Sequence, residues 1–117
     1  MRILLATFVF LHGAVHGIMF GLPLIPDVKR DMAPFNPSHS WLLGERPSAA
    51  FALALAVTAA FALASGSYLA RASWWPSAMI AAAALSLLLL VLFASKYFLV
   101  GFPISIALAV CAWQAQT

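Results

Sequence analysis

The sequence predicts an all-α, polytopic membrane protein whose four transmembrane helices form an antiparallel bundle in a single domain. Of its 117 residues, 65% are hydrophobic and only 8% are charged, and the mean hydropathy is +1.03. A soluble domain is about half apolar and about a quarter charged. The chain instead carries four apolar runs, and an apolar run of about 20 residues spans a hydrocarbon core of about 30 Å. Lipid is therefore the expected solvent.

The first predicted span covers residues 3–22, ILLATFVFLHGAVHGIMFGL. A signal peptide also begins with a basic residue and an apolar stretch. This run is longer than the usual apolar region of a signal peptide, and no small-x-small cleavage signal follows it. Pro23, Pro26 and charged residues come next. We therefore expect a helix that is retained in the membrane.

Residues 23–47 form the polar segment of the chain and contain five of its seven prolines. Proline fixes φ and removes a backbone donor, so no long helix is expected there. The segment also contains apolar residues that a fully hydrated loop would not need. It is therefore predicted to lie at the membrane interface and to pack over the helix ends.

The second predicted span, residues 49–70, contains no charged residue and follows Pro47 and Ser48, which favour a helix start. The third predicted span covers residues 77–95. Tryptophan and basic residues favour the membrane–water interface, so they are expected to anchor the ends of the spans. The predicted anchors are Trp41, Arg71, Trp74, Trp75 and Lys96.

The fourth predicted span, residues 98–114, must be separated from the third by a turn. As one helix, residues 77–113 would be about 55 Å long at about 1.5 Å per residue, which is too long for one crossing. The turn is expected between Ser95 and Pro103, with the Lys96 side chain reaching toward the interface. Four spans would place both ends of the chain on the same side of the membrane.

The charges favour the lipid bilayer over nucleic acid as the partner. The net charge is +3, but the six Lys and Arg residues are scattered along the flanks of the apolar runs. The three carboxylates all lie in one loop, and the chain contains no phosphate-binding loop and no nucleophile paired with a base. Cys111 is the single cysteine, so the chain forms no internal disulfide. These features predict no enzyme activity.

Two histidines in the first apolar run are the candidate ligands of the chain. His12 and His16 are four residues apart, so they share a helix face, and Met19 follows on the same stripe. A copper or zinc ion accepts such ligands, but the set is too small for a complete site. No metal or other cofactor is therefore predicted, with quinone, haem or metal binding as the alternative.

The structural interpretation of these histidines is that each neutral imidazole bonds to a neighbouring helix. Interhelical hydrogen bonds of this kind stabilise membrane proteins by about 0.5–2 kcal/mol each. The opposing interpretation is that an ionisable residue within the membrane marks a binding site. The hydroxyl partners available on the other predicted spans are Thr58, Ser65, Ser86 and Ser105.

Small residues recur at every fourth position on the first two predicted spans. Glycines without side chains let a second helix approach closely in lipid. We expect the glycine stripe of the first span to pack against the alanine stripe of the second. The predicted packing residues are Gly13, Gly17, Gly21, Ala52, Ala56, Ala60 and Ala64.

The segments FLHGAVHGIMF, WLLGE and ARASWWP, in this order between apolar helices, resemble those of small four-helix bacterial membrane proteins of the DoxX-like type. The resemblance implies a helical bundle in the bacterial plasma membrane. For some members of that group it also implies a quinone-linked redox role as a subunit. No catalytic residue of the family matches a motif in this chain.

Together these features predict a multi-pass membrane protein that acts as a structural or accessory subunit, self-associated or bound to a larger membrane protein. A quinone-, haem- or metal-binding redox subunit that uses His12 and His16 is the first alternative. A small-solute transporter is the second, although no span has a charged lining and no inverted repeat is detectable.

Overall fold

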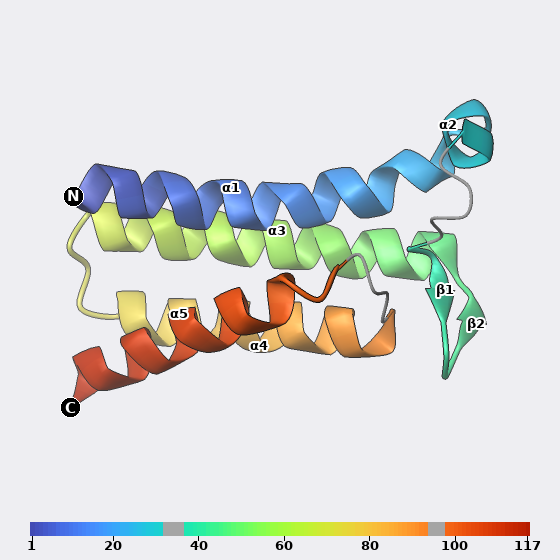
Figure 1. The fold of residues 1–117 in the computed structure, drawn as a ribbon. Coiled ribbons are helices and arrows are strands. Elements are labelled where there is room, and N and C mark those ends of the chain that lie inside the picture. Colours follow the sequence, from blue (N-terminus) through green and yellow to red (C-terminus); the bar gives the residue numbers. More distant parts are fainter. Residues whose placement is uncertain (32–36, 94–97) are drawn as a thin grey trace.

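The computed structural model describes residues 1–31, 37–93 and 98–117, and most of them are helical (Figure 1). Four longer helices are accompanied by short elements that connect the first two of them. The elements in chain order are helix α1 (Arg2–Gly21), 3-10 helix η1 (Leu22–Leu24), helix α2 (Pro26–Asp31), strands β1 (His39–Ser40) and β2 (Gly44–Glu45), and helices α3 (Pro47–Leu69), α4 (Trp75–Leu92) and α5 (Gly101–Gln116).

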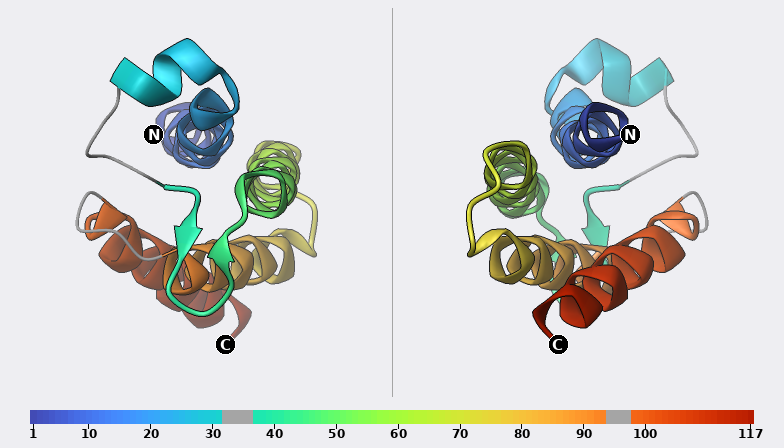
Figure 2. Two further views of the ribbon diagram at one scale, coloured as in Figure 1. Left: turned by 90° about the vertical axis from the view of Figure 1, so that its right-hand side faces the viewer. Right: turned by 90° about the vertical axis from the view of Figure 1, so that its left-hand side faces the viewer.

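The long helices pack in the order of the chain. Helix α1 contacts α3, α3 contacts α4, and α4 contacts α5, so the four helices form an arc when viewed end-on (Figure 2). The two termini lie at one end of the molecule, and α2 and the strands lie at the other (Figure 1). The buried core runs along the inside of this arc and includes the large side chains of Val9, Phe20, Phe61, Leu89 and Phe93.

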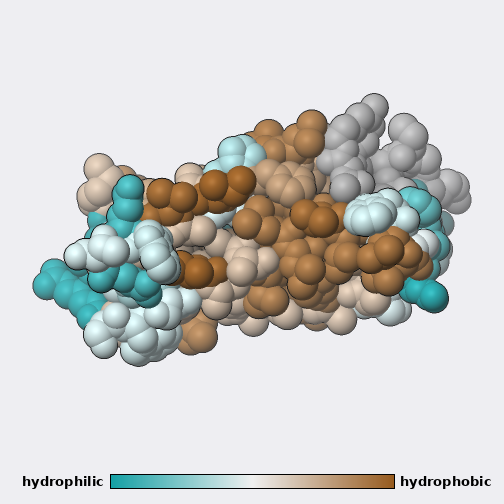
Figure 3. Space-filling view, turned by 90° about the horizontal axis from the view of Figure 1, so that it is seen from below, coloured by the Kyte–Doolittle hydropathy of each residue, from teal (hydrophilic) through white to brown (hydrophobic). Residues whose placement is uncertain are grey.

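Three helical segments among the described residues are long and apolar enough to cross a membrane. They are Arg2–Leu24, Pro47–Leu69 and Trp75–Leu92. Helix α5 has 16 residues, which correspond to about 24 Å, somewhat less than a hydrocarbon core of about 30 Å. A crossing by α5 therefore stays a prediction. The face in Figure 3 is hydrophobic over its middle and hydrophilic toward both ends, as in membrane proteins.

The two short strands correct the all-α prediction for one segment. They pair antiparallel, with His39 opposite Glu45 and Ser40 opposite Gly44. The Ser40 Oγ accepts the N–H groups of Leu42 and Leu43 at 3.2 and 3.1 Å, and Gly44 has a φ of +75°, which glycine adopts without strain. Strands of two residues are too short to show an alternating sequence pattern, so the sequence predicts only a segment without a long helix here.

A hydrogen bond from Trp41 joins this hairpin to the end of α4. Its Nε1 donates a hydrogen bond of 2.7 Å to the Val91 carbonyl, which lies in the last helical turn, where carbonyls have no partner within the helix. The Lys29 Nζ on α2 also lies 3.2 Å from the Glu45 Oε1 on β2. The hairpin thus packs over the end of α4, and the position of residues 23–47 at the membrane interface stays a prediction.

The opposite end of the molecule contains the other described anchors. The Arg2 Nη1 donates a 2.8 Å hydrogen bond to the Tyr68 carbonyl, and its guanidinium lies 4.9 Å from the centre of the Tyr68 ring. That ring lies 5.0 Å from the Trp75 ring. Arg71 turns the chain between α3 and α4 with a φ of +58°, and it is exposed, as is Trp74. Lys96 and Ser95 lie outside the described residues.

Candidate functional site

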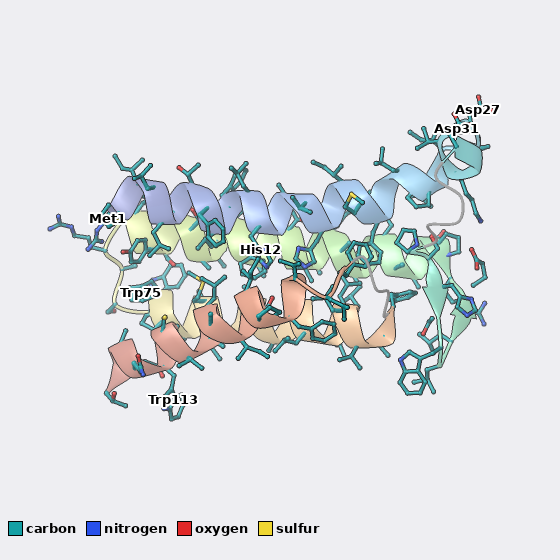
Figure 4. The ribbon with its side chains drawn as sticks, viewed as in Figure 1. Met1, His12, Asp27, Asp31, Trp75 and Trp113 are labelled. Carbon is teal, nitrogen blue, oxygen red and sulfur yellow. The ribbon has the colours of Figure 1, made fainter. Side chains whose placement is uncertain are left out.

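His12 and His16 lie near the middle of α1. Their rings are 5.0 Å apart and nearly perpendicular. Figure 4 places His12 about midway between the end with Met1 and Trp75 and the end with Asp27 and Asp31. The two histidines are therefore at the depth of the hydrophobic middle of the helices.

Two serines connect these histidines across three helices. The Ser86 Oγ on α4 lies 2.9 Å from the His16 Nε2 and 2.9 Å from the Ser105 Oγ on α5. The Ser105 Oγ in turn lies 3.4 Å from the His12 Nε2. Both serines are fully buried. We call these four residues the His–Ser network, and it joins α1, α4 and α5.

The other two predicted hydroxyl partners bond to the backbone of α1 instead. The Thr58 Oγ1 donates to the Gly13 carbonyl and the Ser65 Oγ to the Ala6 carbonyl, each at 2.8 Å. Both hydroxyls lie on α3, so these bonds stabilise the contact between α1 and α3. In lipid such bonds are worth about 1 kcal/mol each.

The three glycines of α1 lie against large or polar side chains of α3. A Cβ at Gly13 would overlap with Phe61, and one at Gly17 would lie 2.9 Å from the Thr58 Oγ1. A Cβ at Gly21 would lie 2.9 Å from the Phe51 ring. Each of these positions therefore has no room for a side chain as the helices are packed.

The alanine stripe is not the partner of these glycines, which corrects the prediction. Ala52 and Ala56 are exposed, Ala60 is half-buried, and only Ala64 is buried. Residues four apart are displaced by about 40° around a helix with 3.6 residues per turn. Over three such steps the stripe turns by about 120°, from the exposed positions Ala52 and Ala56 to the buried position Ala64.

Met19 belongs to the packing of the core and is not part of the His–Ser network. Met19 is half-buried and packs against the hydrophobic core. Within residues 1–31, 37–93 and 98–117, no three His, Cys, Asp or Glu side chains are grouped so that they could hold a metal ion. The His16 ring also uses both nitrogens in hydrogen bonds, to the His12 carbonyl and to the Ser86 Oγ.

A pocket lies beside the His–Ser network, where α1 faces the start of α5. Its volume is about 370 Å³. Its polar lining comes from His12 and His16, and apolar side chains of α1, α4, α5 and the residues just before α5 form most of its wall. The apolar members include Phe8, Val15, Leu90, Phe98 and Ile104. The α1–α5 side is also the open side of the arc of helices in Figure 2.

Sequence reasoning identified the histidines and the serines one by one but did not predict the pocket. A signal for the network was present, since Ser86 and Ser105 are single hydroxyls within long apolar runs.

Comparisons of the chain with protein-family models, curated proteins and solved structures give no match. The DoxX-like resemblance therefore stays a prediction.

Proposed function

We propose that the protein is a four-span protein of the bacterial plasma membrane that acts as a non-enzymatic subunit and holds a lipophilic small molecule between α1 and α5. The pocket beside the His–Ser network carries this proposal. Its volume of about 370 Å³ is within the range of about 300–1,000 Å³ that is typical of small-molecule sites. Its mostly apolar wall with two histidines has the composition of such sites.

The location of the pocket supports a ligand that enters from the lipid. The pocket lies on the open side of the arc, and α1 carries exposed apolar side chains next to it, such as Leu11 and Val15. A lipophilic molecule dissolved in the bilayer would reach the histidines without crossing water. A histidine within the membrane is costly unless it has a partner, and such residues commonly mark a functional site.

The role as a subunit is supported by the outer face of α5. Ile106, Val110 and Trp113 follow one another at spacings of four and three residues, so they share one helix face. Each is about half exposed or more, and Trp113 points away from the bundle in Figure 4. An apolar face of this kind offers van der Waals contacts to a helix of a second copy or of a larger membrane protein.

Thermal unfolding in lipid nanodiscs tests the pocket. We chose 4-octylphenol and 4-octylanisole as probes, compared at equal concentrations in the membrane and followed by circular dichroism. A ligand that binds the native state raises the melting temperature in a saturable manner. At least one probe should do so for the unmodified protein.

Two variants of α1 provide the matched comparison. Val15 lines the pocket, whereas Ile18 is similarly exposed on the same helix but does not. Val15→Trp should fill the pocket and abolish the stabilisation, and Ile18→Trp should retain it. If neither probe stabilises the unmodified protein, or if both variants respond alike, the proposed binding function is wrong.

A further inference from the structure

The His–Ser network has one consistent direction of hydrogen bonding. The His16 Nδ1 lies 2.8 Å from the His12 carbonyl oxygen, and a carbonyl only accepts, so Nδ1 carries the proton. In a neutral imidazole the other nitrogen is then an acceptor. The Ser86 hydroxyl must therefore donate its proton to the His16 Nε2. A charged imidazole at this depth would be costly in lipid.

The direction continues through the serines to His12. The Ser86 Oγ has donated its proton to His16, so the 2.9 Å contact between the two serines requires that Ser105 is the donor. The Ser105 Oγ then has no proton left for His12, and the His12 Nε2 must be the donor in the 3.4 Å contact. Each of the two hydroxyls thus accepts one hydrogen bond and donates one.

This order determines what His12 offers to the pocket. With its proton on Nε2, the neutral ring has a lone pair on Nδ1. No hydrogen bond joins this Nδ1 to any residue that the structure describes, and it is not enclosed by them. Every polar hydrogen of the network is used within the network. His12 lines the pocket, and its side chain therefore has an acceptor and no free donor to offer there.

We infer that the pocket binds a lipophilic alcohol or phenol, whose hydroxyl donates a hydrogen bond to the His12 Nδ1 while its apolar body lies against Phe8, Val15 and Ile104. This inference rests on the binding function proposed above and names the class of its ligand. A molecule with only acceptor groups, such as a ketone or an ester, would find no free proton in the network. An acyl chain without a head group would leave the Nδ1 unpaired.

The two probes named above distinguish these classes. 4-Octylphenol has a hydroxyl that donates, whereas 4-octylanisole has the same ring and tail but an ether oxygen that only accepts. The unmodified protein should bind the phenol roughly three- to tenfold more tightly than the anisole, which is the effect of about one neutral hydrogen bond. The readout is the membrane concentration of each probe that gives half of the maximal stabilisation.

A histidine pair provides the control. His12→Phe keeps a ring of similar size and removes the acceptor, so the two probes should bind equally. His39→Phe makes the same change in the exposed hairpin, outside the pocket, and the preference for the phenol should remain. Should His12→Phe fail to fold, the preference of the unmodified protein decides the question by itself.

The possible failures are distinct. Equal binding of the two probes, blocked by Val15→Trp, would mean that the pocket holds an apolar molecule and that the ligand class inferred here is wrong. Tighter binding of the anisole would overturn the class as well. Binding of neither probe would overturn the binding function itself.

Discussion

The Ser86 Oγ lies 2.9 Å from the His16 Nε2, and this buried hydrogen bond joins α4 to α1. The same hydroxyl lies 2.9 Å from the Ser105 Oγ on α5, so one side chain connects three helices. Helices in lipid gain little from the hydrophobic effect when they associate, and polar bonds of this kind help to specify their packing.

Loss of the Ser86 hydroxyl should destabilise the bundle. Ser86→Ala leaves the His16 Nε2 without its donor, and an unsatisfied buried polar group costs about 1–3 kcal/mol. The control is Ser67→Ala, since the Ser67 Oγ is also buried but bonds to the Ala64 carbonyl of its own helix. Unfolding in detergent, followed by circular dichroism, measures the difference. Equal effects of the two variants would show that the network contributes nothing specific.

Two glycines should respond in opposite ways to alanine. A Cβ at Gly13 overlaps with Phe61, whereas a Cβ at Gly66 has no neighbour within 4 Å. Gly13→Ala should destabilise the protein by about 1–3 kcal/mol through overpacking. Gly66→Ala should stabilise it by about 0.5–1 kcal/mol, because alanine loses less backbone freedom in a helix. Melting temperatures in nanodiscs test both, and a Gly13→Ala protein as stable as the parent would contradict the close α1–α3 contact.

The fourth crossing can be tested by cysteine accessibility in intact cells. In a Cys111→Ser background, Lys29→Cys reports on the α2 end of the molecule and Gln116→Cys on the end of α5. If α5 crosses the membrane, a membrane-impermeant maleimide should label only one of the two positions. Labelling of both from the same side would mean three crossings, with α5 lying within or on one leaflet.

The Trp41 contact should hold the hairpin against α4. Trp41→Phe keeps an aromatic ring but removes the Nε1–H that bonds to the Val91 carbonyl. Amide hydrogen exchange over residues 39–45 should become several-fold faster in this variant, since about 1 kcal/mol of local stability corresponds to roughly fivefold. Trp113→Phe on the exposed face of α5 is the control and should leave this exchange unchanged.

The purified protein is expected to contain neither haem nor a bound transition metal in stoichiometric amounts. Both nitrogens of His16 are already engaged in hydrogen bonds, so ligation by His16 would require the network to break, and His12 alone would supply a single ligand. Absorbance spectroscopy and elemental analysis measure this directly. Stoichiometric haem or metal that is lost in His12→Asn and His16→Gln variants would refute the present interpretation of the histidines.

The composition and the lengths of the apolar runs were sufficient to predict the class of protein and its first three helices. This is because the thickness of the bilayer sets the length of a spanning helix, and that length is visible in a linear sequence. The ends of the first two spans, next to Pro23 and Arg71, were predictable from the local signals of a proline and a basic residue. The fourth span was expected from residue 98, whereas α5 begins at Gly101. The exact helix ends and the hairpin at His39–Glu45 were less predictable from the sequence, because they depend on tertiary contacts such as the one between Trp41 and Val91.

The sequence also determined which residues were candidates for the site, since His12, His16, Ser86 and Ser105 are conspicuous polar groups in apolar runs. Only the tertiary structure decided their pairing, the direction of the hydrogen bonds and the presence of the pocket. Helices of nearly uniform apolarity carry almost no signal for how each is rotated about its own axis. That rotation is set by packing, here by glycines of α1 that admit Phe61, Thr58 and Phe51, and it brings the two serines toward the two histidines.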